Sequence, residues 1–278
     1  MASRRKFLSL VGGGVVVAAG ASAAGFALTR TPKKALAPWQ HPGASYGDAR
    51  KRFLSYAILA PNPHNQQPWL VDLSHEGQIW LYVDHTRLLP HTDPYNRQIT
   101  IGLGCFLELL VQAAAQDGYL AELSLFPRGQ NNTVLNDAPI ASIKVSKPEG
   151  ITSDPLFESV LERRSVKKPF DTSKPVEASV LSELEAVNLN GVTVGSTNAQ
   201  KMLAELKEIS WQAHNIEMET PRTLQESIDV MRFGKQEIDA NPDGIDLGGA
   251  FLESLMVLGM LDRRQMIVQP YVCNFGLV

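Results

Sequence analysis

The sequence predicts an α+β protein, with an α/β arrangement as the alternative. Apolar residues recur at helical spacing in many stretches, and only a few short runs have the alternation or the β-branched content of strands. Helices separated by occasional strands are typical of these two classes. The composition, 44% apolar and 20% charged, is that of an ordinary globular protein.

The first predicted helix covers residues 48–59, with Asp48 as a suitable N-cap. Pro61 must end this helix because a proline ring clashes with the preceding helical turn. The segment 60–69 contains three prolines and four amide side chains, so it is expected to run as a fixed loop.

A β-hairpin is predicted next, because the runs 69–73 and 79–84 bracket a polar turn. Residues 101–117 are apolar nearly all round and predict a central buried helix, with Gly118 as its C-cap glycine. Two further strands are expected at 121–126 and 139–146, on either side of a polar turn at 130–132.

The second half of the sequence is mainly helical in pattern. After a connector at 147–155, Asp154 is a suitable N-cap for a helix that runs to Arg164. A single strand is expected at 192–196. The remaining periodic stretches predict four helices, at 177–187, 197–217, 222–239 and 249–262.

The N-terminus has the pattern of a twin-arginine export signal. Arg4 and Arg5 precede an uncharged stretch, Leu8 to Leu28, and residues 21–23 offer a small-x-small cleavage site. We therefore expect residues 1–37 to be a signal peptide and linker outside the fold, and the twin-arginine machinery to export the protein to the periplasm or another extracytoplasmic space. An uncleaved N-terminal membrane anchor is the alternative.

Several function classes are excluded by charge and by missing motifs. The net charge is −3 with both signs interspersed, so nucleic acid is not an expected partner. Two cysteines, Cys105 and Cys273, do not make a disulfide framework. The histidines lack metal-binding spacing, so His64 is expected to be a loop residue rather than a metal ligand.

A basic cluster is the first candidate site. It contains Arg163, Arg164, Lys167 and Lys168, with Ser165 between them. One interpretation is a solvated helix end that complements the helix dipole. The other is an anion site, because arginine offers paired donors to a phosphate while lysine and serine add a charge and a hydroxyl.

The loop between the prolines is the second candidate. It places five hydrogen-bonding side chains close together: Asn62, His64, Asn65, Gln66 and Gln67. Amide residues favour turns for purely local reasons, but such a set can also bind a polar heterocycle through hydrogen bonds.

Together the two segments resemble the nitroreductase family of flavin enzymes, and in particular its exported, Acg-type branch. The P-S-x-x-N-x-Q-P-W signature of that family is matched by Pro61, Asn62, Asn65, Gln67, Pro68 and Trp69. Its R-x-S-x-R/K signature is matched by Arg163, Ser165 and Lys167. The stretches 97–110 and 231–249 also look like the exported branch, without an assignable role.

The resemblance implies a nitroreductase-like α+β fold and an FMN site. The arginine, serine and lysine of the second signature would hold the FMN phosphate, ribityl chain and ring edge, and the amide loop would contact the same flavin. Because each signature occurs once, we expect two fused nitroreductase-like halves, 38–150 and 151–278, that form one composite site as a pseudo-dimeric monomer. The second half is expected to be truncated, since family members continue further.

The implied function is that of an FMN-dependent oxidoreductase. It would pass hydride or electrons from NAD(P)H or another donor through FMN to a small acceptor, with no catalytic protein side chain. Two alternatives stay open: a protein that binds or sequesters FMN without turnover, and a truncated inactive product.

Overall fold

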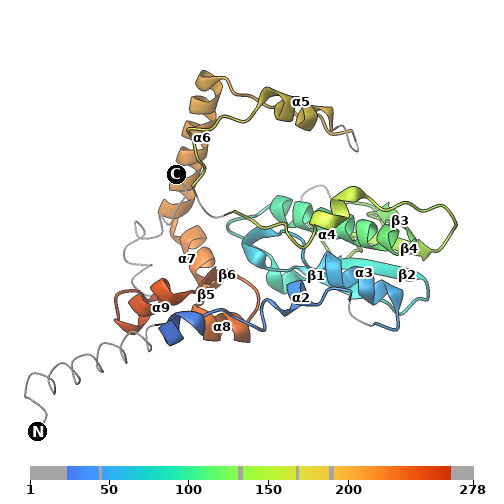
Figure 1. Cartoon of the computed structure of the whole chain (residues 1–278), viewed down its shortest axis with the longest axis horizontal. Helices are drawn as coiled ribbons and strands as arrows, with labels where there is room; N and C mark the ends of the chain where they lie inside the picture. Colours follow the sequence, from blue (N-terminus) through green and yellow to red (C-terminus); the bar gives the residue numbers. More distant parts are fainter. Residues whose placement is uncertain (1–23, 44–45, 131–133, 167–168, 188–190, 264–278) are drawn as a thin grey trace, which may run out of the picture.

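A computed structural model describes residues 24–43, 46–130, 134–166, 169–187 and 191–263 of the chain (Figure 1). The twin-arginine pair, the predicted cleavage site, Lys167, Lys168 and the C-terminal residues 264–278 lie outside the described residues.

The first half of the protein is built on a four-stranded antiparallel sheet of order β1-β2-β4-β3. Its strands are β1 (Trp69–Asp72), β2 (Gln78–Val83), β3 (Leu120–Leu125) and β4 (Ala141–Ser146). The predicted hairpin is confirmed, because β1 pairs with β2. Alternate residues of β2 are buried, as expected for a strand with one face on the core.

Two helices complete the core of this half: α3 (Ala49–Ala57) and α4 (Arg97–Gln116). Asp48 caps α3, since its side chain accepts a hydrogen bond from the amide of Arg50. The prediction for α4 was wrong at its start. The buried carboxylate of Asp93 accepts from the amides of Arg97 and Ile99, so it satisfies the first turn four residues earlier than expected.

Helix α4 is buried on one side only. Leu103 and Leu110 are completely buried, whereas 68% of Ile101 is exposed, so the helix is not covered all round as predicted. Among the described residues, α4 is the one helix long and apolar enough to cross a membrane by length and composition. Half of its apolar window is buried inside the protein, which is typical of the core helix of a globular unit.

The second half contains an extended arm and a small lobe (Figure 1). The arm consists of α5 (Ala178–Ala186) and α6 (Gln200–Glu219). The lobe has a parallel strand pair around a small core, and its elements are α7 (Pro221–Asp229), β5 (Met231–Phe233), α8 (Gly234–Ala240), β6 (Ile245–Leu247) and α9 (Ala250–Val257). Four short helical turns link the larger elements: α2 (Ala37–Gln40), η1 (Pro63–Asn65), η2 (His85–Arg87) and η3 (Pro155–Ser159).

Three predicted elements of the second half are corrected. Asp154 does cap a helix, but the helix is only the short η3, after which the chain turns and buries Val160. Residues 192–196 are not a strand, because no neighbouring strand pairs with them among the described residues. The predicted helix at 222–239 is interrupted by β5, because β6 offers that segment a pairing partner.

The segment before α3 makes specific contacts with the lobe, although the sequence had suggested a linker outside the fold. We call residues 29–39 the N-terminal strap. The amides of Lys34 and Ala35 donate to Asp239 Oδ1 at 2.8 and 3.2 Å. Arg30 pairs with Glu253 at 3.1 Å. These contacts attach the strap to the lobe.

Candidate functional site

A cavity of about 280 Å³ brings the two candidate segments together. Six of the eight predicted site residues line it, three from the amide loop and three from the basic cluster: Asn62, Asn65, Gln67, Arg163, Arg164 and Ser165. The two segments are about a hundred positions apart in the sequence, so their meeting is a result of tertiary folding. Lys167 lies outside the described residues, and His64 does not line the cavity.

A larger cavity of about 670 Å³ lies between the strap and the lobe, but it contains neither signature. The carboxylates of Asp239 and Glu253 line it and offset part of the positive charge of its lysines and arginine. We take the smaller cavity as the candidate site because it concentrates amide side chains and arginines without carboxylate partners among the described residues, and such polar groups fix a polar ligand.

The amide loop is closed by one of its own side chains. Asn62 Oδ1 accepts a hydrogen bond from the amide of Gln67 at 2.7 Å, and Asn62 Nδ2 donates to the carbonyl of Ala60 at 3.1 Å. His64, Asn65 and Gln67 have φ values of 48°, 51° and 53°. Non-glycine residues in this left-handed region cost about 1 kcal/mol each and persist where the surrounding structure holds them.

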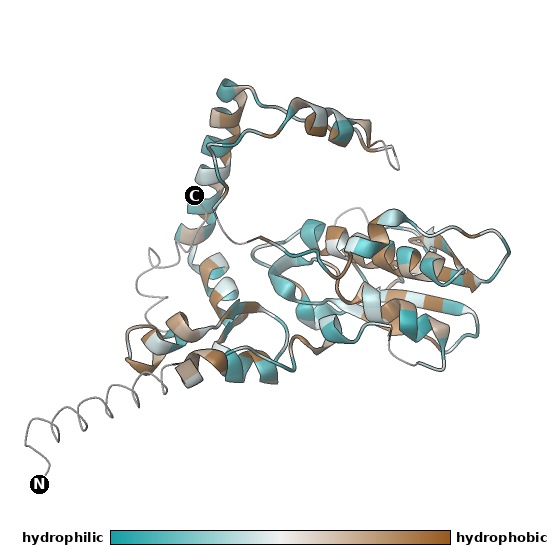
Figure 2. Ribbon diagram, viewed as in Figure 1, coloured by the Kyte–Doolittle hydropathy of each residue, from teal (hydrophilic) through white to brown (hydrophobic). Residues whose placement is uncertain are grey.

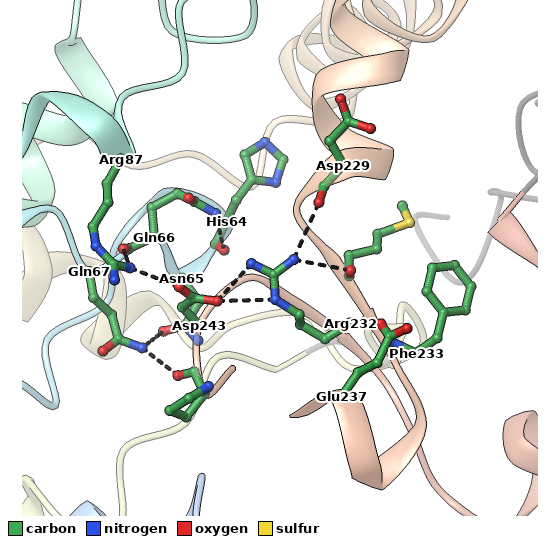
Figure 3. A network of polar contacts seen from close by, with 12 residues as sticks. His64, Asn65, Gln66, Gln67, Arg87, Asp229, Arg232, Phe233, Glu237 and Asp243 are labelled. Atoms are coloured by element: carbon green, nitrogen blue, oxygen red, sulfur yellow. Dashed lines mark hydrogen bonds and ion pairs between the residues drawn. The ribbon is translucent and has the colours of Figure 1, made fainter. Parts of the chain in front are cut away.

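The lobe supplies the contacts that hold this loop (Figure 3). The amide of Gly244 donates to the carbonyl of Asn65 at 3.1 Å, and Gln67 Nε2 donates to the carbonyl of Pro242 at 2.6 Å. Gly244 has a φ of 78°, and a Cβ at this position would lie 2.1 Å from the carbonyl oxygen of Val230. Only glycine is therefore compatible with this turn.

An aspartate joins the two parts of the molecule next to the loop. Asp243 accepts from Arg87 of the first half at 2.8 Å and from Arg232 of the lobe at 2.7 Å (Figure 3). Burial by itself would raise the pKa of the Asp243 carboxyl, but the hydrogen bonds from Arg232 and Arg87 outweigh it, so the pKa lies below its ordinary value. Arg87 also donates to the carbonyl of Gln66 at 2.9 Å and so reaches the amide loop directly.

The two arginines of the cavity are held by carbonyl groups rather than by carboxylates. Arg163 Nη2 donates to the carbonyl of Leu59 at 2.7 Å, and Arg164 Nη1 donates to those of Leu161 and Arg163. Neither guanidinium forms an ion pair with an acidic residue that the structure describes. Their positive charge is thus available to a ligand.

Two observations show that the hydrogen-bond donors and the positive charge of Arg163 are not fully satisfied by the protein. Its Nε is buried and has no hydrogen-bond partner among the described residues. Burial, with the neighbouring charge of Arg164, lowers the pKa of the Arg163 guanidinium. A buried donor without a partner is costly, so an anion bound here would relieve both the missing hydrogen bond and the charge repulsion.

His64 belongs to the amide loop but does not line the cavity. Burial lowers the pKa of its imidazole, and the acidic residues Glu217 and Glu226 only partly oppose this effect. The ring is therefore neutral at pH 7 and adds no charge to the site. No group of three or more metal-ligating side chains occurs among the described residues.

Comparison with known proteins adds a partial match. No protein-family model matches the chain. Over 125 residues it is 30% identical to a protein of Mycobacterium tuberculosis (strain H37Rv) named "Putative NAD(P)H nitroreductase acg". Over 127 residues it is 28% identical to an uncharacterized protein of the same strain. Each match covers 44% of this chain but only 36% of the relative, so the chain spans little more than a third of their length.

This similarity supports a nitroreductase-type oxidoreductase. The mixed α and β structure with its antiparallel sheet is consistent with that type of fold, as the sequence predicted. A nitroreductase-type protein in general uses a flavin. The cavity offers both cations and amides, which is consistent with such a cofactor.

The sequence missed the residues that fix the site from outside the two signatures. Asp243, Arg232 and Gly244 all lie in the stretch 231–249, which resembles the exported branch but had no assigned role. Their only local signal is the Pro-Asp-Gly turn at 242–244, which predicts a tight turn but does not show what the turn contacts.

Proposed function

We propose that the protein is an FMN-dependent oxidoreductase of the nitroreductase type, which passes hydride or electrons from NAD(P)H or another donor to a small acceptor. One observation supports this above the others: the amide loop and the arginine pair, which resemble the two flavin signatures, line a single cavity. Bound FMN would supply the redox chemistry, so no side chain needs to act as an acid or a base.

The residues fit the charged end of the cofactor. Arg163 and Arg164 would bind the phosphate with paired donors, and the exposed Ser165 would add a hydroxyl. The volume of about 280 Å³ is slightly below the usual range of small-molecule pockets, about 300–1,000 Å³, so this cavity suits the phosphate end rather than the whole of FMN.

The three amides of the cavity differ in their availability. Asn62 and Gln67 are used to close the loop and to bind the lobe. Asn65 Oδ1 has only a long contact of 3.4 Å, from Gln67. Asn65 is therefore the amide best able to contact the flavin, while Asn62 and Gln67 position it.

The proposal is tested by the cofactor content of the purified full-length chain. Protein expressed with its signal intact is denatured, and the released material is identified by absorbance and chromatography. We expect FMN in the native protein and at least tenfold less in Arg163→Ala. Arg128→Ala, which removes an exposed arginine that does not line the cavity, is the matched control. A native chain that refolds but never binds FMN would contradict the proposal.

The alternative proposal is that the protein binds or sequesters FMN without turnover, since the groups that line the cavity are suited to binding FMN whether or not a substrate follows. Adding NAD(P)H under anaerobic conditions separates the two: loss of the yellow flavin absorbance supports the oxidoreductase, and an unchanged spectrum supports the binding protein.

We also propose that two nitroreductase-like halves form this site and that the chain is exported by the twin-arginine route with FMN already bound. The export machinery takes folded proteins, and a site that needs two distant segments forms only after folding. Replacing Arg4 and Arg5 with lysine should retain the protein in the cytoplasm, as fractionation would show. Periplasmic protein in that variant would contradict the export proposal.

A further inference from the structure

We infer that the N-terminal strap is a third component of the phosphate-binding site, in which Lys34 is a ligand-binding cation and Trp39 is a positioning residue. The inference rests on the proposed function and deepens it. Both residues line the cavity that contains the arginine pair. Neither belongs to the two flavin signatures.

Trp39 holds both arginines without neutralising them. Its ring lies 4.1 Å from Arg164 Cζ and 5.6 Å from Arg163 Cζ. These are distances at which an aromatic face attracts a guanidinium. A carboxylate in the same place would also hold the arginines, but it would cancel the charge that an anion needs. An indole keeps two like charges close together and leaves their positive field in place.

Lys34 adds a third positive charge. Its backbone amide is fixed by Asp239 Oδ1 at 2.8 Å, so the start of its side chain is anchored to the lobe. Its ammonium forms no ion pair with any acidic side chain that the structure describes. It lies at the border of this cavity and the larger one behind the strap.

The charges of the cavity are therefore all of one sign. Lys34, Arg163 and Arg164 line it, and its described lining contains no aspartate or glutamate. Three cations around a volume this small suit a phosphate monoester, which has a charge near −2 at pH 7. The strap should thus increase the preference for FMN over riboflavin, which differs by that phosphate.

The position at which the signal peptide is cleaved decides whether the mature protein keeps the strap. Cleavage at the predicted site, residues 21–23, would leave Lys34 and Trp39 in the mature protein. Cleavage at the end of the predicted linker, near residue 37, would remove the lysine and free the tryptophan from its anchor.

The test measures FMN and riboflavin binding to the full chain by equilibrium dialysis. Lys34→Gln is compared with Lys33→Gln, which changes an adjacent exposed lysine that does not line the cavity. We expect Lys34→Gln to weaken FMN binding about tenfold and riboflavin binding by less than twofold, with Lys33→Gln unchanged. Trp39→Leu should weaken FMN binding at least tenfold, and Trp39→Phe should restore most of it, because phenylalanine keeps the aromatic face.

Circular dichroism identifies variants that fail to fold, and Trp39→Phe remains informative if Trp39→Leu does so. If the native chain binds FMN and Lys34→Gln matches Lys33→Gln in both affinities, the inference is overturned. Equal losses for FMN and riboflavin would also overturn it, since a strap that only supports the fold would not discriminate between them.

Inorganic phosphate separates this inference from the proposed function. Phosphate binding is followed by the change in tryptophan fluorescence that is present in the native chain and absent in Trp39→Phe. If the native chain binds no FMN but binds phosphate with a dependence on Lys34, the strap is supported and the flavin proposal fails. If it binds neither FMN nor phosphate, both fail.

Discussion

The two longest described helices, α4 and α6, have the same length of 20 residues and opposite surroundings. Leu103 of α4 is completely buried in the core that α4 forms with α3 and the sheet. In α6 no described residue is buried, and Leu206 and Ile209 are 51% and 64% exposed. Figure 1 shows α6 leading away from the first half, and Figure 2 shows that the arm also bears apolar residues.

The difference shows that helical periodicity and burial are separate properties. Apolar residues of α6 recur three and four positions apart, at Met202, Leu206, Ile209 and Ala213, which is the pattern of a helix with one apolar face. The pattern defines the helix, but most helical stability in proteins comes from packing of that face. The compact first half is therefore expected to set the global stability, and the arm to open at a lower free energy.

The largest expected effect comes from matched truncations in the two helices. Leu103→Ala should lower the free energy of unfolding by about 2–5 kcal/mol, because it leaves a cavity in a closed core. Leu206→Ala should change it by less than about 0.5 kcal/mol, because its side chain is half exposed. Urea denaturation of both variants measures the contrast. Equal losses would show that α6 is packed as closely as α4.

A smaller effect is expected where the first half meets the lobe. Asp243→Asn removes the charge that binds Arg87 and Arg232, and should destabilise the protein by about 1.5–3 kcal/mol, the range for hydrogen bonds to charged groups. Glu183→Gln, an exposed substitution on α5, is the control and should be neutral. An unchanged unfolding midpoint for Asp243→Asn would mean that the two parts are held together by other contacts.

Helix capping gives a third comparison between the regions. Asp48→Ala removes the side-chain cap of α3 and should cost about 1 kcal/mol. Glu177→Ala at the N-cap of α5 should have no measurable effect, because Glu177 makes no side-chain capping bond. Thermal or urea unfolding checks both variants, and a loss at Glu177 similar to that at Asp48 would be the contrary result.

The smallest effect is a pH dependence. The pKa of Asp243 is lower in the folded protein than its ordinary value, so its stabilisation is fully present above about pH 4 and is lost as the pH falls through the folded pKa. The gap in unfolding free energy between the native chain and Asp243→Asn should stay constant from about pH 7 to 5 and narrow below about pH 4. A gap that widens on acidification would contradict the assigned ion pairs.

Local patterns predicted most of the elements in the first half. The hairpin, the capped helix α3 and the C-terminal glycine of α4 depend on alternation, a capping aspartate and a left-handed glycine, all of which lie close together in the sequence. Errors occurred where a contact outside the periodic pattern changed the outcome. Asp93, just before α4, caps the helix at an earlier residue than predicted. The more distant β6 pairs with residues 231–233, which had been predicted as part of a helix.

The candidate site divides in the same way. The sequence by itself singled out the amide loop and the arginine pair, because prolines, amides and adjacent cations are recognisable by residue type and spacing. Only the tertiary structure decided that these segments share one cavity, that Asp243 joins the two parts beside it, and that Lys34 and Trp39 of the strap complete its wall. The physical reason is that contacts between distant segments depend on packing and on unpaired charge. Neither of these properties produces a periodic pattern or a motif in the sequence.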